Sequence, residues 1–176
     1  SIVQNLAELP MGESFDEEDI FESYRKNGCG RFALGRAFHW EKGQLTQVKH
    51  SDPIDQKDMI GYEFQRNAVI ENTRVMLSGK PTNNVLLYGD SGTGKSATVK
   101  SLVNIPEFYN LRLIEIAKNS LDELTELIRT ISHHTQKFII YIDDLSFEQE
   151  DKGFSALKTA LDNAGFGIQL CEINPS

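Results

Sequence analysis

Short, nearly continuous apolar runs alternate with longer stretches of helical period from residue 56 onwards. Such apolar runs are typical of strands that are buried on both faces of a parallel sheet. We therefore expect strands at NVLLYG (84–89), LRLIEIAK (111–118), KFIIYIDDL (137–145) and IQLCEI (168–173). The intervening patterns predict helices over residues 56–78, 95–104, 120–132 and 154–163. Strands that alternate with helices predict an α/β fold with a mostly parallel sheet flanked by helices.

Two of these predicted helices carry further signals. In the first, Phe64, Ala68 and Val75 fall near one face, and the sequence GKP closes the helix. The third begins with Ser120 as the expected N-cap and has Glu123 three residues later. This spacing is that of a capping box, in which the two side chains bond the free N–H groups of the first turn.

The first part of the chain has a mixed pattern. The stretch ESFDEEDIFESYRKNG predicts a helix whose capping box is Ser14 and Glu17. The stretch RFALGRAFHWEKGQLTQV is rich in aromatic and other residues that favour strands. It has a glycine turn at Gly43 and predicts a hairpin that pairs Ala37–Trp40 with Leu45–Val48. An Asp-Pro pair then breaks the chain, so we expect a small helix and hairpin extension over residues 1–52 and the α/β core over residues 53–176.

The strongest motif is GDSGTGKS, which runs from Gly89 to Ser96 and fits G-x-x-x-x-G-K-[ST] in full. It lies between a predicted strand and a predicted helix, which is the context of a phosphate-binding loop. Glycines let backbone N–H groups point inward at an anion, and the positive end of the next helix faces the same place. We expect Lys95 to contact the β- and γ-phosphates and the Ser96 hydroxyl to ligate Mg²⁺. The alternative is a glycine-rich turn with a chance Lys-Ser pair. The residues expected to bind nucleotide are Gly89, Asp90, Ser91, Gly92, Thr93, Gly94, Lys95, Ser96 and Ala97.

Two carboxylates follow the apolar run FIIYI. Asp143 ends this predicted strand, and the carboxyl ends of parallel strands lie at one edge of the sheet. We expect Asp143 to hold Mg²⁺ as a Walker-B carboxylate, and the alternative is that it caps the following turn. Asp144 is the expected catalytic residue that orients the attacking water, although this position carries Glu in many ATPases. Glu148 is a second candidate for this base.

Composition and charge narrow the function classes. The chain is 39% apolar and 25% charged, which is the profile of a soluble globular protein, and no run is long enough for a membrane helix. A net charge of -8 disfavours non-specific binding to nucleic acid. The first residues do not have the pattern of a signal peptide. Neither Cys29 nor Cys171 has a partner at metal spacing, so we expect free thiols in a reducing compartment, the cytoplasm.

The phosphate loop alone does not identify the nucleotide. The sequence has no N-K-x-D tetrad that would read guanine, and neither Asp143 nor Asp144 begins a D-x-x-G, so ATP is favoured over GTP. A nucleoside-type kinase would need several arginines in a lid. After Lys95 the only arginines are Arg112 and Arg129, which are far apart in the sequence, so a small-molecule kinase is the least favoured alternative.

Several stretches together resemble an uncharacterised bacterial family of predicted AAA-superfamily P-loop ATPases. They are GRFALGRAFHWEKGQLTQVKHSDPI, MIGYEFQRNAVIENTRVML, PTNNVLLYGDSGTGKSATVKSL, LRLIEIAKNSLDELTELI and KFIIYIDDLSFEQED with FSALKTALDN, so the similarity covers about residues 28–163. The resemblance implies that the first core helix flanks the adenine and that Ile60, Gly61 and Tyr62 line the base. The alternative for these three residues is ordinary packing at the start of a helix.

The end of the chain departs from this family. Its members continue into a strand that ends in Ser-Asn-Arg-Arg, where the Asn is expected to position water, whereas this chain has AGFGIQLCEINPS and no arginine after Asn174. The helical lid subdomain is also missing, so we expect Mg-dependent ATP binding with slow hydrolysis by this chain alone. The expected function is an ATPase that acts as a homo-oligomer and remodels a protein or nucleic-acid partner. The alternative is a nucleotide-dependent switch or loader module with little turnover.

Overall fold

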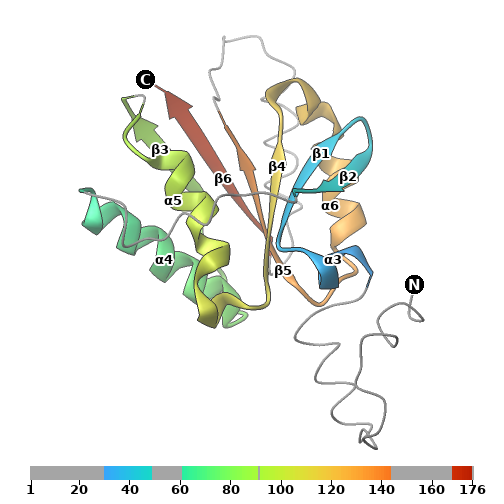
Figure 1. Ribbon diagram of the computed structural model, residues 1–176, viewed down its shortest axis with the longest axis horizontal. Coiled ribbons are helices and arrows are strands. Elements are labelled where there is room, and N and C mark those ends of the chain that lie inside the picture. Colours follow the sequence, from blue (N-terminus) through green and yellow to red (C-terminus); the bar gives the residue numbers. More distant parts are fainter. Residues whose placement is uncertain (1–29, 49–60, 91, 144–167, 176) are drawn as a thin grey trace, which may run out of the picture.

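The computed structural model describes residues 30–48, 61–90, 92–143 and 168–175. The described chain forms a six-stranded sheet in the order β2-β1-β4-β5-β6-β3 (Figure 1). Every neighbouring pair is parallel except the β1–β2 hairpin. The strands are β1 (Ala37–Glu41), β2 (Gln44–Gln47), β3 (Val85–Gly89), β4 (Leu111–Ile116), β5 (Lys137–Ile142) and β6 (Ile168–Pro175). The predicted α/β fold with a mostly parallel sheet is confirmed.

Helices cover both faces of this sheet. The α-helices are α3 (Arg31–Leu34), α4 (Glu63–Leu77), α5 (Lys95–Ser101) and α6 (Leu124–Ile131), and the 3-10 segments are η2 (Leu102–Asn104), η3 (Pro106–Phe108) and η4 (Lys118–Glu123). Alternate residues of β4 and β5 point to opposite faces. Leu113 and Ile139 pack in one cluster with residues of α4 and α5, whereas Ile114 and Ile140 pack in the other cluster with residues of α6. The predicted helix at 154–163 lies outside the described residues.

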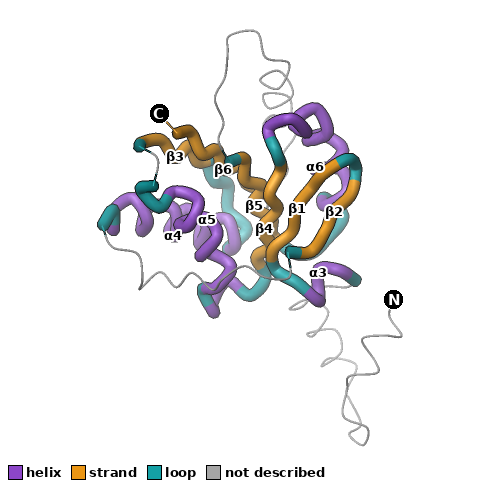
Figure 2. The backbone as a smooth tube through the Cα atoms, turned by 45° about the horizontal axis from the view of Figure 1, so that its top comes forward, coloured by secondary structure: helices purple, strands orange, loops and turns teal. Residues whose placement is uncertain are grey.

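The predicted hairpin is part of the same sheet as the phosphate loop. β1 pairs antiparallel with β2 and, on its other side, parallel with β4, from Ala37 opposite Leu113 to Trp40 opposite Ile116. Figure 2 shows the hairpin at one end of the sheet and β3, with α4 and α5 beside it, at the other end. The helix expected around residues 14–27 and the boundary expected at residue 52 lie outside the described residues.

Strand β3 corrects the expectation that NVLLYG is buried on both faces. The strand is at the edge of the sheet and has only β6 beside it among the described strands. Val85 and Leu87 pack against the cluster under α4 and α5, whereas Leu86 and Tyr88 are 56% and 79% exposed. A continuous apolar run therefore did not distinguish an edge strand from a central one.

Helix α4 also buries a different face from the one predicted. Phe64, Ala68 and Val75 are exposed, and the buried positions are Val69, Thr73 and Met76. Thr73 can lie in the interior because its hydroxyl donates a hydrogen bond to the Val69 carbonyl oxygen at 2.9 Å. Residues 56–60 of the predicted helix lie outside the described residues, and the described helix starts at Glu63.

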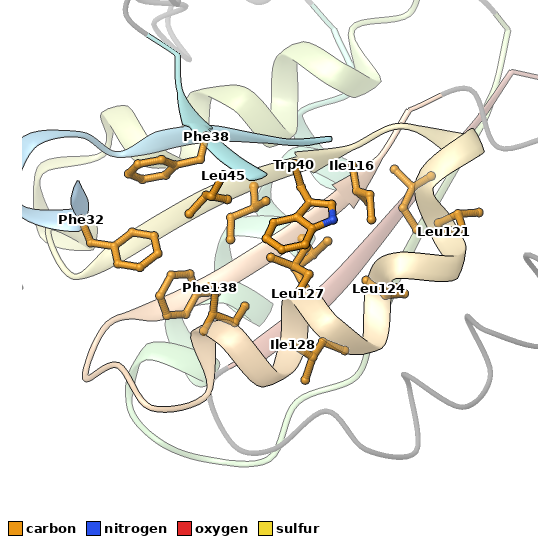
Figure 3. Close-up of a cluster of buried hydrophobic side chains, with 14 residues drawn as sticks. Phe32, Phe38, Trp40, Leu45, Ile116, Leu121, Leu124, Leu127, Ile128 and Phe138 are labelled. Carbon is orange, nitrogen blue, oxygen red and sulfur yellow. The ribbon is translucent and has the colours of Figure 1, made fainter. Parts of the chain in front are cut away.

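The predicted capping box at Ser120 and Glu123 is wrong. Both residues lie within η4, α6 starts at Leu124, and no side chain caps it. The Glu123 carboxylate instead accepts hydrogen bonds from Trp40 Nε1 at 2.8 Å and from the Gly43 N–H at 2.7 Å. These bonds join the hairpin to the start of α6, beside the apolar cluster in which Trp40 lies (Figure 3).

None of the helices in the described part of the chain has the length and hydropathy that a membrane-spanning helix needs.

Candidate functional site

The loop between β3 and α5 has the backbone that its glycines predict. Strand β3 ends at Gly89 and helix α5 begins at Lys95. Gly92 and Gly94 have φ angles of 79° and 82°, a left-handed conformation that side chains with a Cβ rarely adopt. Thr93 Oγ1 donates to the Asp90 carbonyl oxygen at 2.9 Å and closes the turn. Ser91 lies outside the described residues.

The Lys95 side chain folds back over this loop. Its ammonium donates to the carbonyl oxygens of Gly89 and Asp90 at 2.6 and 2.7 Å, and it lies 3.4 Å from Thr93 Oγ1. The Gly94 carbonyl accepts from the Thr98 N–H at 2.8 Å and fixes the first turn of α5 behind it. A positive charge is therefore held at the loop, where an anion would make charge-assisted bonds to it.

Ser96 and Asp143 meet at the carboxyl edge of the sheet. Ser96 is in the first turn of α5, and Asp143 directly follows β5. The Ser96 hydroxyl donates to Asp143 Oδ1 at 3.1 Å. Both groups supply oxygen, the donor that Mg²⁺ prefers, and such sites combine one or two carboxylates with substrate phosphates. These two residues therefore fit the magnesium role that the sequence predicts. Asp144 and Glu148 lie outside the described residues.

A polar pair that the sequence analysis did not single out lies next to Asp143. Tyr141 is buried, and its hydroxyl donates to the Glu115 carboxylate on β4. Burial raises the pKa of Tyr141, and the bond to Glu115 and the charges of Glu115 and Asp143 raise it further, so the phenol stays protonated as a donor. The Lys100 ammonium lies 5.6 Å from the centre of the Tyr141 ring. The available signal was the presence of Glu115 and Tyr141 inside two strands that are otherwise mostly apolar.

A cavity of about 260 Å³ lies between the phosphate loop and the start of α4. Gly61 and Tyr62, two of the three residues expected at the base, line it, and Ile60 lies outside the described residues. The remaining lining residues are Arg66, Gly92, Thr93, Gly94 and Thr98. Sequence reasoning missed Arg66, although it lies one helical turn after Tyr62. Its guanidinium donates to the Gly61 carbonyl oxygen at 2.9 Å.

Arg112 is not part of this site. It is buried, and its guanidinium donates to the carbonyl oxygens of Phe32, Tyr109 and Leu111 at 2.7 to 2.9 Å. Burial and the nearby charge of Arg36 lower the pKa of Arg112 to about 10. Arg112 therefore connects α3 and the segment before β4, and it does not serve as the lid arginine that a small-molecule kinase would need.

The phosphate loop after an edge strand and the acidic residue after β5, in a sheet with helices on both faces, define a P-loop α/β fold. The chain belongs to the family described as "Protein of unknown function (DUF815)", whose model matches residues 33–166. Together with the sequence relatives described next, this match confirms the expected membership of an uncharacterised AAA-superfamily ATPase family.

Two relatives are similar in sequence to part of the chain. The chain is 30% identical over 118 residues to an ORC1-type DNA replication protein of Methanocorpusculum labreanum. This alignment covers 60% of this chain and 28% of that protein. The chain is 26% identical over 118 residues to proteasome-activating nucleotidase 1 of Haloferax volcanii. This alignment covers 59% of this chain and 29% of that protein. The match thus spans less than a third of either relative.

Two solved structures share the fold. The C. elegans PCH-2 structure has a TM-score of 0.57 at 18% identity, covering 78% of this chain and 45% of that chain. The Aeropyrum pernix ORC1 protein in complex with DNA has a TM-score of 0.52 at 19% identity, covering 65% of this chain and 38% of that chain. At these identities the similarity concerns the fold alone.

Proposed function

We propose that this chain binds ATP with Mg²⁺ at the Gly89–Ser96 loop and is the nucleotide-binding core of an ATPase. The observation that supports this most directly is the meeting of three groups at one edge of the sheet. The Lys95 ammonium is held over the loop, and the Ser96 hydroxyl lies 3.1 Å from Asp143 Oδ1 beside it. A cation, a neutral oxygen and a carboxylate are what a magnesium–triphosphate group requires.

Each residue then has a defined task. Lys95 exchanges the carbonyl oxygens of Gly89 and Asp90 for oxygens of the β- and γ-phosphates. Ser96 and Asp143 hold Mg²⁺, which when bound neutralises charge on the phosphate oxygens. The rest of the loop, including Ser91 and Ala97, lines the phosphates. Asp144 orients the attacking water as a general base.

The base is proposed to lie in the cavity beside α4. Gly61 and Tyr62 line this cavity next to the loop, and Ile60 directly precedes them in the sequence. The preference for adenine over guanine is inferred from the sequence, which lacks the N-K-x-D tetrad that reads guanine. We infer a reducing, cytoplasmic setting from two cysteines that lack metal spacing.

Coupling of hydrolysis to remodelling is proposed from the relatives. One is named a proteasome-activating nucleotidase and the other a DNA replication protein, so both a protein and a nucleic acid are candidate partners. We propose a homo-oligomer in which a neighbouring copy supplies an arginine to the γ-phosphate. Arg129 on α6 and the arginines near the hairpin are exposed or half-buried and are candidates for this role.

A nucleotide-dependent switch or loader with little turnover is the second candidate. It is favoured by the segment after residue 163, which departs from the Ser-Asn-Arg-Arg pattern of the resembling family. An arginine at the γ-phosphate contributes about 10³–10⁵ in rate, so a core without one would keep its nucleotide largely intact.

The experiment measures phosphate release from ATP and from GTP over a range of protein concentrations, with and without DNA. The ATPase proposal expects release from ATP to exceed release from GTP, and a rise in specific activity with concentration if an arginine is supplied by a neighbour. Stimulation by DNA would favour a nucleic-acid partner. Tight ATP binding without turnover under any condition would favour the switch, and equal use of GTP would contradict the assignment to ATP.

A further inference from the structure

We propose that Tyr141 is a positioning residue for the magnesium site: Glu115 and Lys100 hold its ring so that Asp143 stays opposite Ser96. This inference rests on the proposed function, because it concerns how the same site is kept in shape. It assigns a task to three side chains, Tyr141, Glu115 and Lys100, which are not expected to touch the nucleotide themselves.

Besides apolar packing, helix α5 and the end of strand β5 make two polar contacts that carry the proposal. Ser96 and Lys100 are four residues apart on α5 and therefore share one face of the helix. Asp143 and Tyr141 are two residues apart at the end of β5, and both point to α5, since each contacts it. The first contact is the hydrogen bond from Ser96 Oγ to Asp143 Oδ1 at 3.1 Å. The second is the Lys100 ammonium, 5.6 Å from the centre of the Tyr141 ring.

In the second contact, the Tyr141 ring is held in one orientation by its surroundings. Its side chain is 2% exposed and packs in the cluster under α4 and α5. Its hydroxyl donates to Glu115, which lies directly opposite it in the β4–β5 register. A buried hydroxyl that loses its acceptor is costly, so this bond holds the ring in one orientation and joins the two strands at this level.

Binding of a magnesium ion would affect the two contacts differently. Ser96 and Asp143 are the proposed magnesium ligands, so their bond to each other is given up when both oxygens turn to a cation. The Lys100–Tyr141 contact lies one helical turn further along α5 and involves no proposed ligand. It therefore keeps α5 at the same distance and rotation against β5 in both states, which is the task of groups that orient metal ligands.

The test is the magnesium dependence of binding of a fluorescent ATP analogue to the full chain and its variants. Tyr141→Phe keeps the ring but loses the hydroxyl, and Lys100→Met keeps an apolar stem but loses the cation. We expect both variants to need about tenfold more Mg²⁺ for half-maximal binding, the lower end of the effect of groups that orient metal ligands. Binding of the analogue in EDTA should be unchanged.

Two further variants separate positioning from stability. Ser101→Ala removes a buried hydroxyl of α5 that donates to the Thr98 carbonyl oxygen at 2.8 Å and does not link α5 to β5. It should lower stability and leave the magnesium midpoint at the parent value. Glu115→Gln keeps an oxygen that can accept the hydrogen bond from the Tyr141 hydroxyl. Its magnesium midpoint should therefore also stay at the parent value.

The inference is overturned if Tyr141→Phe and Lys100→Met have the parent's magnesium midpoint. It is also overturned if they lose affinity equally with Mg²⁺ and in EDTA, because that pattern is a general loss of structure. A parent chain that does not bind the analogue at all contradicts the proposed function itself. A parent that binds with no magnesium dependence contradicts only the magnesium site and the inference built on it.

Discussion

At the scale of single residues, the two neighbouring aspartates are predicted to have different roles. Asp143 lies 3.1 Å from the Ser96 hydroxyl, at the place where a metal ligand is needed. Asp143→Asn should mainly weaken Mg-dependent ATP binding, because an amide no longer matches the charge of the cation. Asp144→Asn should leave ATP affinity unchanged and lower turnover by about 10²–10⁴, the usual contribution of a general base.

Calorimetry with and without Mg²⁺ measures the first effect, and phosphate release under saturating ATP measures the second. Glu148→Gln removes the other candidate base. If Asp144 is the base, turnover by Glu148→Gln should match the parent. If both aspartate variants show the same defects in binding and in turnover, the division of roles between Asp143 and Asp144 is wrong.

At the scale of elements, Glu123 should stabilise the hairpin against α6. Its carboxylate accepts from Trp40 Nε1 and from the Gly43 N–H, so Glu123→Ala removes two bonds that join β1 and the hairpin turn to η4. Hydrogen bonds to charged groups contribute about 1.5–3 kcal/mol each, and partial exposure of Glu123 lowers this, so we expect a loss of about 1–3 kcal/mol.

Urea unfolding followed by the fluorescence of Trp40, the only tryptophan of the chain, measures this loss. The control is Glu126→Ala, which removes an exposed carboxylate from the first turn of α6 and should change stability by less than about 0.5 kcal/mol. ATP binding should be unchanged in both variants, because the hairpin and β3 lie at opposite ends of the sheet. Equal stability of the two variants would show that Glu123 does not hold the hairpin.

At the scale of the whole molecule, the sequence predicts local features better than long-range ones. The loop from Gly89 to Ser96 could be predicted because phosphate binding requires those residue types in that order, and the strands could be predicted from their apolar runs. Pairing of β1 with β4 could not, since it depends on residues more than seventy positions apart that share no local pattern. The edge position of β3 was missed for the same reason.

Competition between hydrogen-bond partners explains the remaining differences between the sequence predictions and the structure. Ser120 and Glu123 have the spacing of a capping box, but Glu123 is within reach of the Trp40 indole, whose buried N–H needs an acceptor. Thr73 could be assigned to the buried face of α4 only after its hydroxyl was seen to bond within the helix. Glu115 and Tyr141 were visible as polar residues in apolar strands, and their meeting across β4 and β5 required the register.

The central claim is that this molecule uses the Gly89–Ser96 loop to bind ATP. The most direct measurement is calorimetric titration of ATP with Mg²⁺ into the parent chain, Lys95→Ala and the control Lys80→Ala, which removes the same charge from an exposed position. The account predicts that the parent and Lys80→Ala bind alike. Lys95→Ala should bind at least about a hundredfold more weakly with unchanged unfolding, since charge-assisted contacts contribute about 1.5–3 kcal/mol each. A folded Lys95→Ala variant that binds ATP like the parent would contradict the account.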